Sequence, residues 1–445
     1  MDLINRKILY RIAPVSLLFQ SLMVFYSLLP PFIVAILCLL IFMFYYRILR
    51  NYFSFPNALF LISILYIPTS TISILGGDYT NLPLTWFNFL HICLFLLSIV
   101  NEKVDRTYFL LMMLFVIVCL YTLVVSLDVL DSMKQILITF LFLMSFILGK
   151  VLKKESSSLF IELGWFFYLL SVISVALQIL LQYIYINVTG NVIGHYGKLG
   201  INRILYAGLM GDFSFASLFL ATGICYVLII YLKTKKINTI FFLTIESLLS
   251  IATILITSRT GIVSLVIVMS LFFLDIRNWT LKYLLVLLGV FSGSFIIVEK
   301  LLSSRLGQSF LDSSGRVGNY IEALDLFFKR PFFGYGMGRD TILKLENFHL
   351  PHNFFIQYLV QIGFIGLIVI LLFFSYFIMG ELKYARSGKW VFWIIMIGSM
   401  FVPDIVTSRF LTCVVILCMI EGQNNMLNER RLCNEKSRKI STKGL

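Results

Sequence analysis

The sequence predicts an all-α fold, a polytopic membrane protein with roughly 12–14 transmembrane helices and a large, partly helical outer loop. The 445 residues are 60% hydrophobic and only 13% charged. Apolar runs of about 20 residues recur from end to end, and this is the length needed to cross about 30 Å of hydrocarbon. A membrane β-barrel would instead show short segments of alternating hydrophobicity.

The apolar runs define the elements in chain order. We expect spans at about 13–29, 31–48, 56–75, 83–100, 107–126, 132–150, 159–186, 209–232, 237–256, 262–274, 280–299, 353–379, 390–402 and 405–421. Residues 1–422 then form one transmembrane domain. The basic segment 423–445 contains few apolar residues, so we expect a disordered cytoplasmic tail.

The basic residues predict the orientation of the chain. Most of the 36 Lys and Arg residues lie in loops on the side of the N-terminus, so the short loops follow the positive-inside rule. We therefore expect both termini in the cytoplasm and the loops 187–208 and 300–352 on the outer face. The net charge of +14 reflects this topology, and it does not indicate a nucleic-acid partner.

The long outer loop has an ordered middle. Val317, Tyr320, Leu324 and Phe328 recur at helical spacing, which predicts an amphipathic helix over 316–329. Pro331 ends it, and the glycines of Gly334-Tyr335-Gly336-Met337-Gly338 predict a turn.

Two positions carry chemistry at the membrane surface. Arg259 stands between two apolar runs, where a lipid-facing arginine costs at least ~2.5 kcal/mol, so it is either functional or snorkels to the interface. His352 follows Pro351 and precedes Asn353, a good N-cap for the next span. An imidazole at this rim suits a general base, or it is simply a polar residue at a helix start.

These motifs, in this order, resemble the O-antigen polymerase and ligase superfamily. The resemblance rests on Thr257-Ser258-Arg259-Thr260-Gly261, on Gly315-Arg316 before Ala323-Leu324-Asp325-Leu326-Phe327, on Pro331, Gly334, Gly336 and Gly338, and on His352-Asn353 with Gln357, Gly363 and Gly366. Arg203 with Gly208 and Gly211-Asp212-Phe213 matches the upstream arginine segment less tightly. The resemblance covers about residues 195–375.

The resemblance implies an inverting glycosyltransferase that uses no metal and no cofactor. Its donor is an oligosaccharide on undecaprenyl diphosphate, used at the periplasmic face of the bacterial inner membrane. Arg203 and Arg259 would hold the diphosphate, and His352 would activate the acceptor hydroxyl. The implied substrate-binding positions are Arg316, His349 and Asn353. Its other partners would be membrane lipid, a chain-length regulator and a flippase.

Three functions remain open at this point. A polymerase of O-antigen or capsule type, which we favour, adds the glycan to a second lipid-linked repeat unit, and a ligase adds it to lipid A-core. A lipid-oligosaccharide flippase or transporter is the third, because Glu246 lies within a span and a buried carboxylate can relay protons. Against this third function, the sequence contains no internal repeat. We expect Glu246 instead to form a hydrogen bond between helices.

Overall fold

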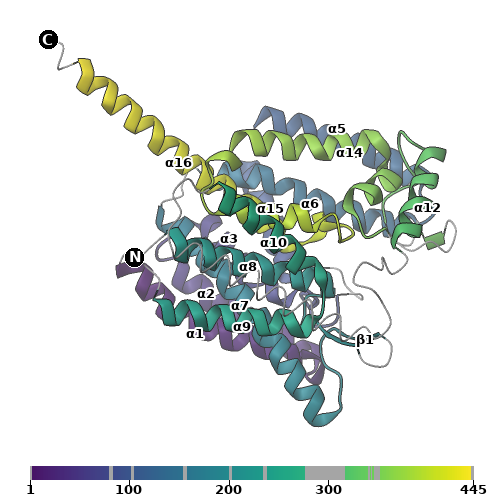
Figure 1. The fold of residues 1–445 in the computed structure, drawn as a ribbon, viewed down its shortest axis with the longest axis horizontal. Helices are drawn as coiled ribbons and strands as arrows, with labels where there is room; N and C mark the ends of the chain where they lie inside the picture. The colour runs from purple at the N-terminus through teal and green to yellow at the C-terminus, as the bar shows by residue number, and fades with distance from the viewer. Residues whose placement is uncertain are drawn as a thin grey trace.

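The computed structural model describes residues 3–79, 84–101, 105–153, 158–199, 203–233, 238–275, 316–338, 341, 343–344 and 351–441. The protein is a bundle of long helices that run along one axis (Figure 1). Within the described residues, nine helices are long and apolar enough to cross a membrane, and four shorter apolar helices accompany them. The predicted all-α polytopic membrane fold is therefore confirmed.

The helices follow the predicted spans closely through most of the chain. Their bounds are α1 Leu3–Leu22, α2 Pro31–Leu49, α3 Phe55–Leu65, α4 Trp86–Asn101, α5 Arg106–Val125, α6 Val129–Lys153, α7 Ser158–Thr189, α8 Phe213–Lys233, α9 Thr239–Ile256, α10 Arg259–Leu274, α12 Arg316–Lys329, α14 Phe354–Gly380, α15 Gly388–Gly398 and α16 Arg409–Ser441. Short 3₁₀ turns cover Met23–Leu28, Ile67–Thr69, Leu382–Tyr384 and Ile405–Thr407. The predicted span at 280–299 lies outside the described residues.

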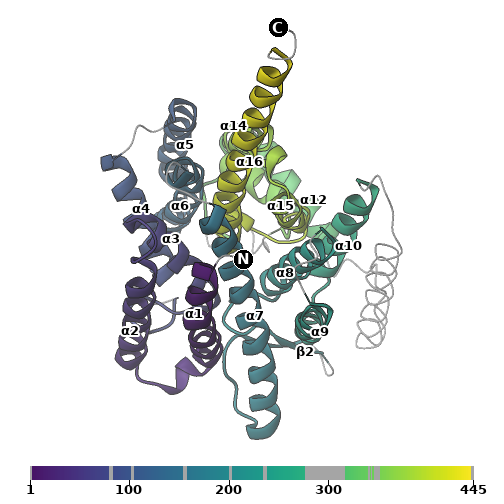
Figure 2. The same cartoon turned by 90° about the vertical axis from the view of Figure 1, so that its left-hand side faces the viewer.

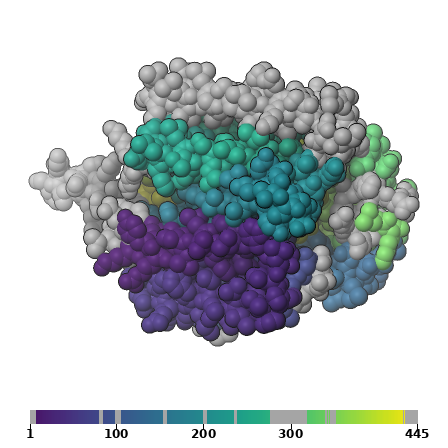
Figure 3. All heavy atoms as spheres, turned by 90° about the horizontal axis from the view of Figure 1, so that it is seen from below, coloured from purple at the N-terminus to yellow at the C-terminus, as the bar shows by residue number. Residues whose placement is uncertain are grey.

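The centre and the edge of the bundle differ in burial. Within an apolar stretch of 18 residues in each helix, 78% of the residues of α7 and 83% of those of α8 are buried. The corresponding shares are 22% for α2 and 33% for α9. Figure 2 accordingly places α7 inside the bundle and α2 at its edge. Figure 3 shows one long side, where α1 and α2 lie beside α7 and α9. Exposed apolar side chains on these four helices include Leu18, Phe32, Ile36, Tyr183, Ile240 and Phe241, as expected for helices in contact with lipid.

The two ends of the bundle carry different features (Figure 1). Both termini lie at one end, which we call the terminal end. The antiparallel hairpin of β1 (Tyr196–Leu199) and β2 (Arg203–Tyr206) lies at the other, with α12. We call this the hairpin end. The side of the membrane that the terminal end faces stays a prediction.

Three segments differ from the predicted spans. The first span was expected at 13–29, but α1 covers Leu3–Leu22 and a 3₁₀ turn follows over Met23–Leu28. The span expected at 56–75 ends as a helix at Leu65, because Pro68 has no amide to continue the helix. The chain then forms turns, bridged between Ile72 and Asp78 and between Ser73 and Thr85. At the C-terminus, α16 continues through Ser441, where the sequence predicted disorder from residue 423. The segment is rich in Glu, Arg, Lys, Leu and Asn, and the first four of these favour helix when they extend an existing one.

The span expected at 353–379 is also not continuous. Gly363 interrupts α14 with φ +66°, and the helix resumes at once. The segment Pro331–Gly338, here called the glycine loop, lies against this break. The amide of Gly336 donates to the carbonyl of Gln361 over 2.9 Å, and the amide of Phe364 donates to the carbonyl of Pro331 over 2.8 Å. Broken helices are tolerated at membrane depth only when neighbouring protein satisfies the freed backbone groups, and this loop does so.

The glycines of this loop therefore do more than form the predicted turn. Gly334, Gly336 and Gly338 all have positive φ. A Cβ at Gly334 would lie 2.4 Å from the carbonyl oxygen of Val360, and one at Gly363 would lie 2.3 Å from the carbonyl carbon of Phe332. The close approach of two backbones requires glycine on both sides.

Candidate functional site

His352 and Asn353 stand at the start of α14, at the hairpin end. The Asn353 side-chain oxygen accepts hydrogen bonds from the amides of Phe355 (3.0 Å) and Ile356 (3.2 Å), so the predicted N-cap is confirmed. Its Nδ2 donates to the carbonyl of Met400 over 3.3 Å. The carbonyl of His352 accepts from the Tyr320 hydroxyl of α12 over 3.0 Å. The backbone carbonyl of His352 is thus bound by α12, and the side chain of Asn353 is bound by the segment that follows α15.

A small separate core supports this helix start. Ala323 and Leu326 of α12 pack with Tyr335 of the glycine loop and Val360 of α14. The predicted helix over 316–329 is confirmed, and its apolar face lies on the first half of α14. The loop also contacts the start of α6, where the Ser132 hydroxyl donates to the carbonyl of Met337. The first half of α14, which follows His352, is therefore supported by α12 and the glycine loop.

Arg259 opens α10, directly after a tight junction with α9. Thr257 adopts φ +53°, a left-handed conformation that ends α9. The hydroxyl of Ser217 in α8 then donates to the carbonyl of Ser258 over 3.2 Å and accepts from the amide of Gly261 over 3.1 Å. A Cβ at Gly261 would lie 2.2 Å from the backbone oxygen of Ser217. This close contact between α8 and α10 fixes the backbone position of Arg259 at the hairpin end.

Arg203 lies at the same end, as the first residue of β2. It pairs with Leu199 in the hairpin, and β2 contacts α9, the helix that leads to Arg259. The backbone of His195 is tied to this region, because its amide donates to the carbonyl of Gly208 over 2.7 Å. Its ring lies 4.8 Å from that of Phe213. Burial lowers the pKa of His195, and the charge of Asp212 opposes this.

The structure brings Arg203, Arg259, His352 and Asn353 to one end of the bundle, on three separate parts of the fold. Arg316, the first residue of α12, belongs to the same end by its backbone position. His349, the remaining predicted substrate-binding residue, lies outside the described residues, as do residues 300–315 and 345–350 of the predicted outer loop.

Sequence reasoning missed an acidic centre beside the start of α14. The carboxylate of Asp404 accepts from the Tyr358 hydroxyl over 2.8 Å and from the side-chain amide of Gln135. Burial raises the pKa of Asp404 to about 6, although both hydrogen bonds act in the opposite direction. The only signal in the sequence was the short gap, Pro403-Asp404, between the spans expected at 390–402 and 405–421. Tyr358 lies one helical turn below Phe354, so Asp404 is linked to the helix that His352 precedes.

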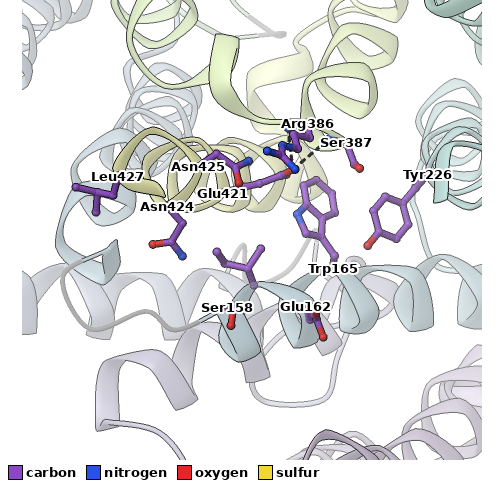
Figure 4. A pocket seen from close by; sticks show the side chains of 11 residues that line it. Ser158, Glu162, Trp165, Tyr226, Arg386, Ser387, Glu421, Asn424, Asn425 and Leu427 are labelled. Carbon is purple, nitrogen blue, oxygen red and sulfur yellow. Dashed lines mark hydrogen bonds between the residues drawn. The ribbon is translucent and has the colours of Figure 1, made fainter. Parts of the chain in front are cut away.

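A cavity of about 550 Å³ lies at the terminal end of the bundle (Figure 4). Its walls include Trp165, Tyr226 and Asn425, and the Glu421 carboxylate caps the start of α15 by accepting from the amides of Arg386 (2.8 Å) and Ser387 (3.0 Å). None of the predicted site residues lines this cavity. We therefore place the candidate site at the hairpin end.

One carboxylate oxygen of Glu246, in α9, does not form the hydrogen bond between helices that we expected. Its Oε1 is buried and has no hydrogen-bond partner within the described part of the chain. The interhelical hydrogen bond that we expected there is thus absent at this atom.

Comparison with known proteins bears on the central part of the chain. A family model described as O-antigen ligase matches residues 245–371, which include Arg259, Arg316, His349, His352 and Asn353. Arg203 lies before the matched segment. No curated protein matches the chain. The match confirms the resemblance that the motifs predicted, and over residues 245–371 it relates this chain to the O-antigen polymerase and ligase superfamily.

Proposed function

We propose that this protein is a polymerase of lipid-linked oligosaccharide repeat units. The observation that carries the proposal is the position of Arg259 and His352 at one end of the bundle, both within the segment that matches the family model. The donor is a glycan on undecaprenyl diphosphate, and the acceptor is a second lipid-linked unit at the periplasmic face of the bacterial inner membrane.

The proposed mechanism is direct displacement at the anomeric carbon. Arg203 and Arg259 hold the donor diphosphate, since guanidinium groups bind phosphate in a bidentate manner and stay charged. His352 takes the proton of the acceptor hydroxyl as its oxygen attacks. The new glycosidic bond forms while the bond to the diphosphate breaks, so the configuration inverts. Fixed positive charge stabilises the leaving group, and the proposed chemistry involves no metal and no cofactor.

The second candidate is a ligase that transfers polysaccharide to lipid A-core, and the match to a family model of O-antigen ligases favours it. A single experiment separates the two enzymes and the transporter. Purified protein in lipid nanodiscs is incubated with one lipid-linked repeat unit and no other acceptor. A ladder of longer glycans supports the polymerase, and transfer that begins only when lipid A-core is added supports the ligase. No transfer in either case, together with movement of lipid-linked sugar across vesicle membranes, would reject both.

A further inference from the structure

Arg409 is a second arginine site at the hairpin end. It opens α16, and its guanidinium carbon lies 5.3 Å from the ring centre of Tyr79. Its Nε is buried and has no hydrogen-bond partner, and within the described residues no carboxylate lies in ion-pair range of it. The residue as a whole is partly exposed, so it can be reached from outside the bundle.

This arrangement leaves a positive charge without compensation. Leaving a largely buried charge without its partner is destabilising, and a cation–π contact offsets only part of that cost. The positive end of the α16 dipole adds to the cost. Asp404, five residues earlier, accepts from Tyr358 and Gln135, and it forms no ion pair with Arg409. The site therefore favours an anion from outside the chain.

Arg409 and Arg259 stand on opposite sides of α8. Ser217 of α8 contacts the Ser258 carbonyl, directly before Arg259. Phe215 and Phe219 contact the ring of Phe410, directly after Arg409, with ring centres 6.3 and 5.2 Å apart. Residues 215 and 219 share one helix face, and residue 217 points to the other. One helix, about 10 Å wide, thus separates two cationic positions at the same end.

We infer that Arg409 holds the diphosphate of the second lipid-linked substrate, the acceptor, while Arg259 serves the donor on the other side of α8. The inference rests on the proposed function, because a polymerase of lipid-linked units needs two polyprenyl diphosphates at one end of the protein. The Tyr79 ring covers one face of the guanidinium. The edge of the fork is then left to bind phosphate in a bidentate manner.

A binding experiment tests this inference without relying on catalysis. Native mass spectrometry counts the undecaprenyl diphosphate molecules bound to the detergent-solubilised protein. We expect two for the wild type, one for Arg409→Gln, one for Arg259→Gln and none for the double variant. Arg330→Gln is the matched control, since Arg330 lies 4.8 Å from the Tyr335 ring but is exposed, and it should still bind two.

Three outcomes would overturn the inference. The wild type binds a single molecule, Arg409→Gln still binds two, or phosphatidylglycerol at equal concentration displaces the second molecule. The last result would identify a general phospholipid headgroup site. If Arg409→Gln does not fold, Arg409→Lys replaces it, and the loss of the fork should still weaken binding of the second molecule.

Kinetics then distinguish a binding role from a structural one. Charge-assisted hydrogen bonds contribute about 1.5–3 kcal/mol, so Arg409→Gln should raise the acceptor KM roughly 10- to 100-fold and leave the donor KM unchanged. With a repeat-unit glycoside that lacks the diphosphate as acceptor, the variant should match the wild type. An equal loss with both acceptors contradicts the inference. Absence of turnover in the wild type rejects the proposed function instead, and the binding count still decides the role of Arg409.

Discussion

The amide of Tyr335 donates a hydrogen bond to the carbonyl of Val360 over 3.0 Å, although the two residues lie in segments that appear unrelated in the sequence. Val360 is among the last residues before α14 breaks at Gly363, so its carbonyl has lost its partner in the helix. The glycine loop supplies that partner. The half-helix that follows His352 is therefore held in place by the loop that follows α12.

Gly363→Ala should weaken this joint. The backbone of Gly363, with φ +66° and ψ −171°, is one that essentially only glycine adopts, so an L-residue there costs about 1–3 kcal/mol, and the new Cβ would also overlap Phe332. We expect a lower melting temperature in detergent and a large loss of polymer formation. Gly380→Ala is the control, because this glycine lies near the other end of α14 and a Cβ there meets nothing within 4 Å. Equal effects in the two variants would show that the joint has no special role.

Arg259→Lys tests the phosphate fork. Lysine keeps the charge but loses bidentate geometry, so we expect normal expression and a loss of most activity. Arg330→Lys, at an exposed position of the same end, should retain activity. Near wild-type polymer from Arg259→Lys would mean that Arg259 only snorkels to the interface.

His352→Ala tests the general base. Loss of such a group typically lowers the rate about 10²–10⁴-fold, and donor binding should be almost unchanged because the arginines remain. Arg203→Ala should weaken donor binding as well. The activity of the wild type should fall as the pH is lowered, because a protonated imidazole cannot accept the acceptor's proton.

His195→Ala is the matched control. His195 also lies at the hairpin end, and the proposed mechanism gives it no role as a base. Substantial turnover in His352→Ala, or donor binding weakened as much as in Arg203→Ala, would reject the base assignment. His349 would then be tested in its place.

Asp404→Asn should change how stability depends on pH. The pKa of Asp404 is raised from 3.8 to about 6 in the folded protein, so the folded state binds the proton more tightly than the unfolded state. The corresponding stability is fully present below pH 4 and is lost as the pH rises through about 6, at about 1.4 kcal/mol per unit of pKa difference. Melting temperatures between pH 4 and 7 measure it.

Asparagine tolerates the left-handed backbone of this position, where φ is +54°, so the variant should fold. Relative to the wild type, Asp404→Asn should gain stability as the pH rises. If the melting temperatures of the two proteins change in parallel across this pH range, Asp404 does not titrate there.

The topology is a further prediction. In a Cys433→Ser background, a membrane-impermeant thiol reagent added to intact spheroplasts should label Ser304→Cys and leave Ser441→Cys unlabelled. The opposite pattern would place the hairpin end in the cytoplasm and exclude a periplasmic site.

The sequence alone determined the features that depend on short stretches of chain. Runs of apolar residues predicted most of the spans, helical spacing predicted α12, and the Pro351-His352-Asn353 order predicted the N-cap of α14. Each follows from the preferences of neighbouring residues and from the thickness of the bilayer. Motif order then identified Arg259 and His352 within the segment that matches the family model.

Only the tertiary structure decided what joins distant segments. The break at Gly363 is stable because residues about 30 positions earlier satisfy its backbone, so a span that is apolar throughout gave no sign of it. Asp404 meets Gln135 across 269 positions, and Arg409 meets Tyr79 from another loop. Contacts of this kind depend on how helices pack against one another, and local preference carries no information about them.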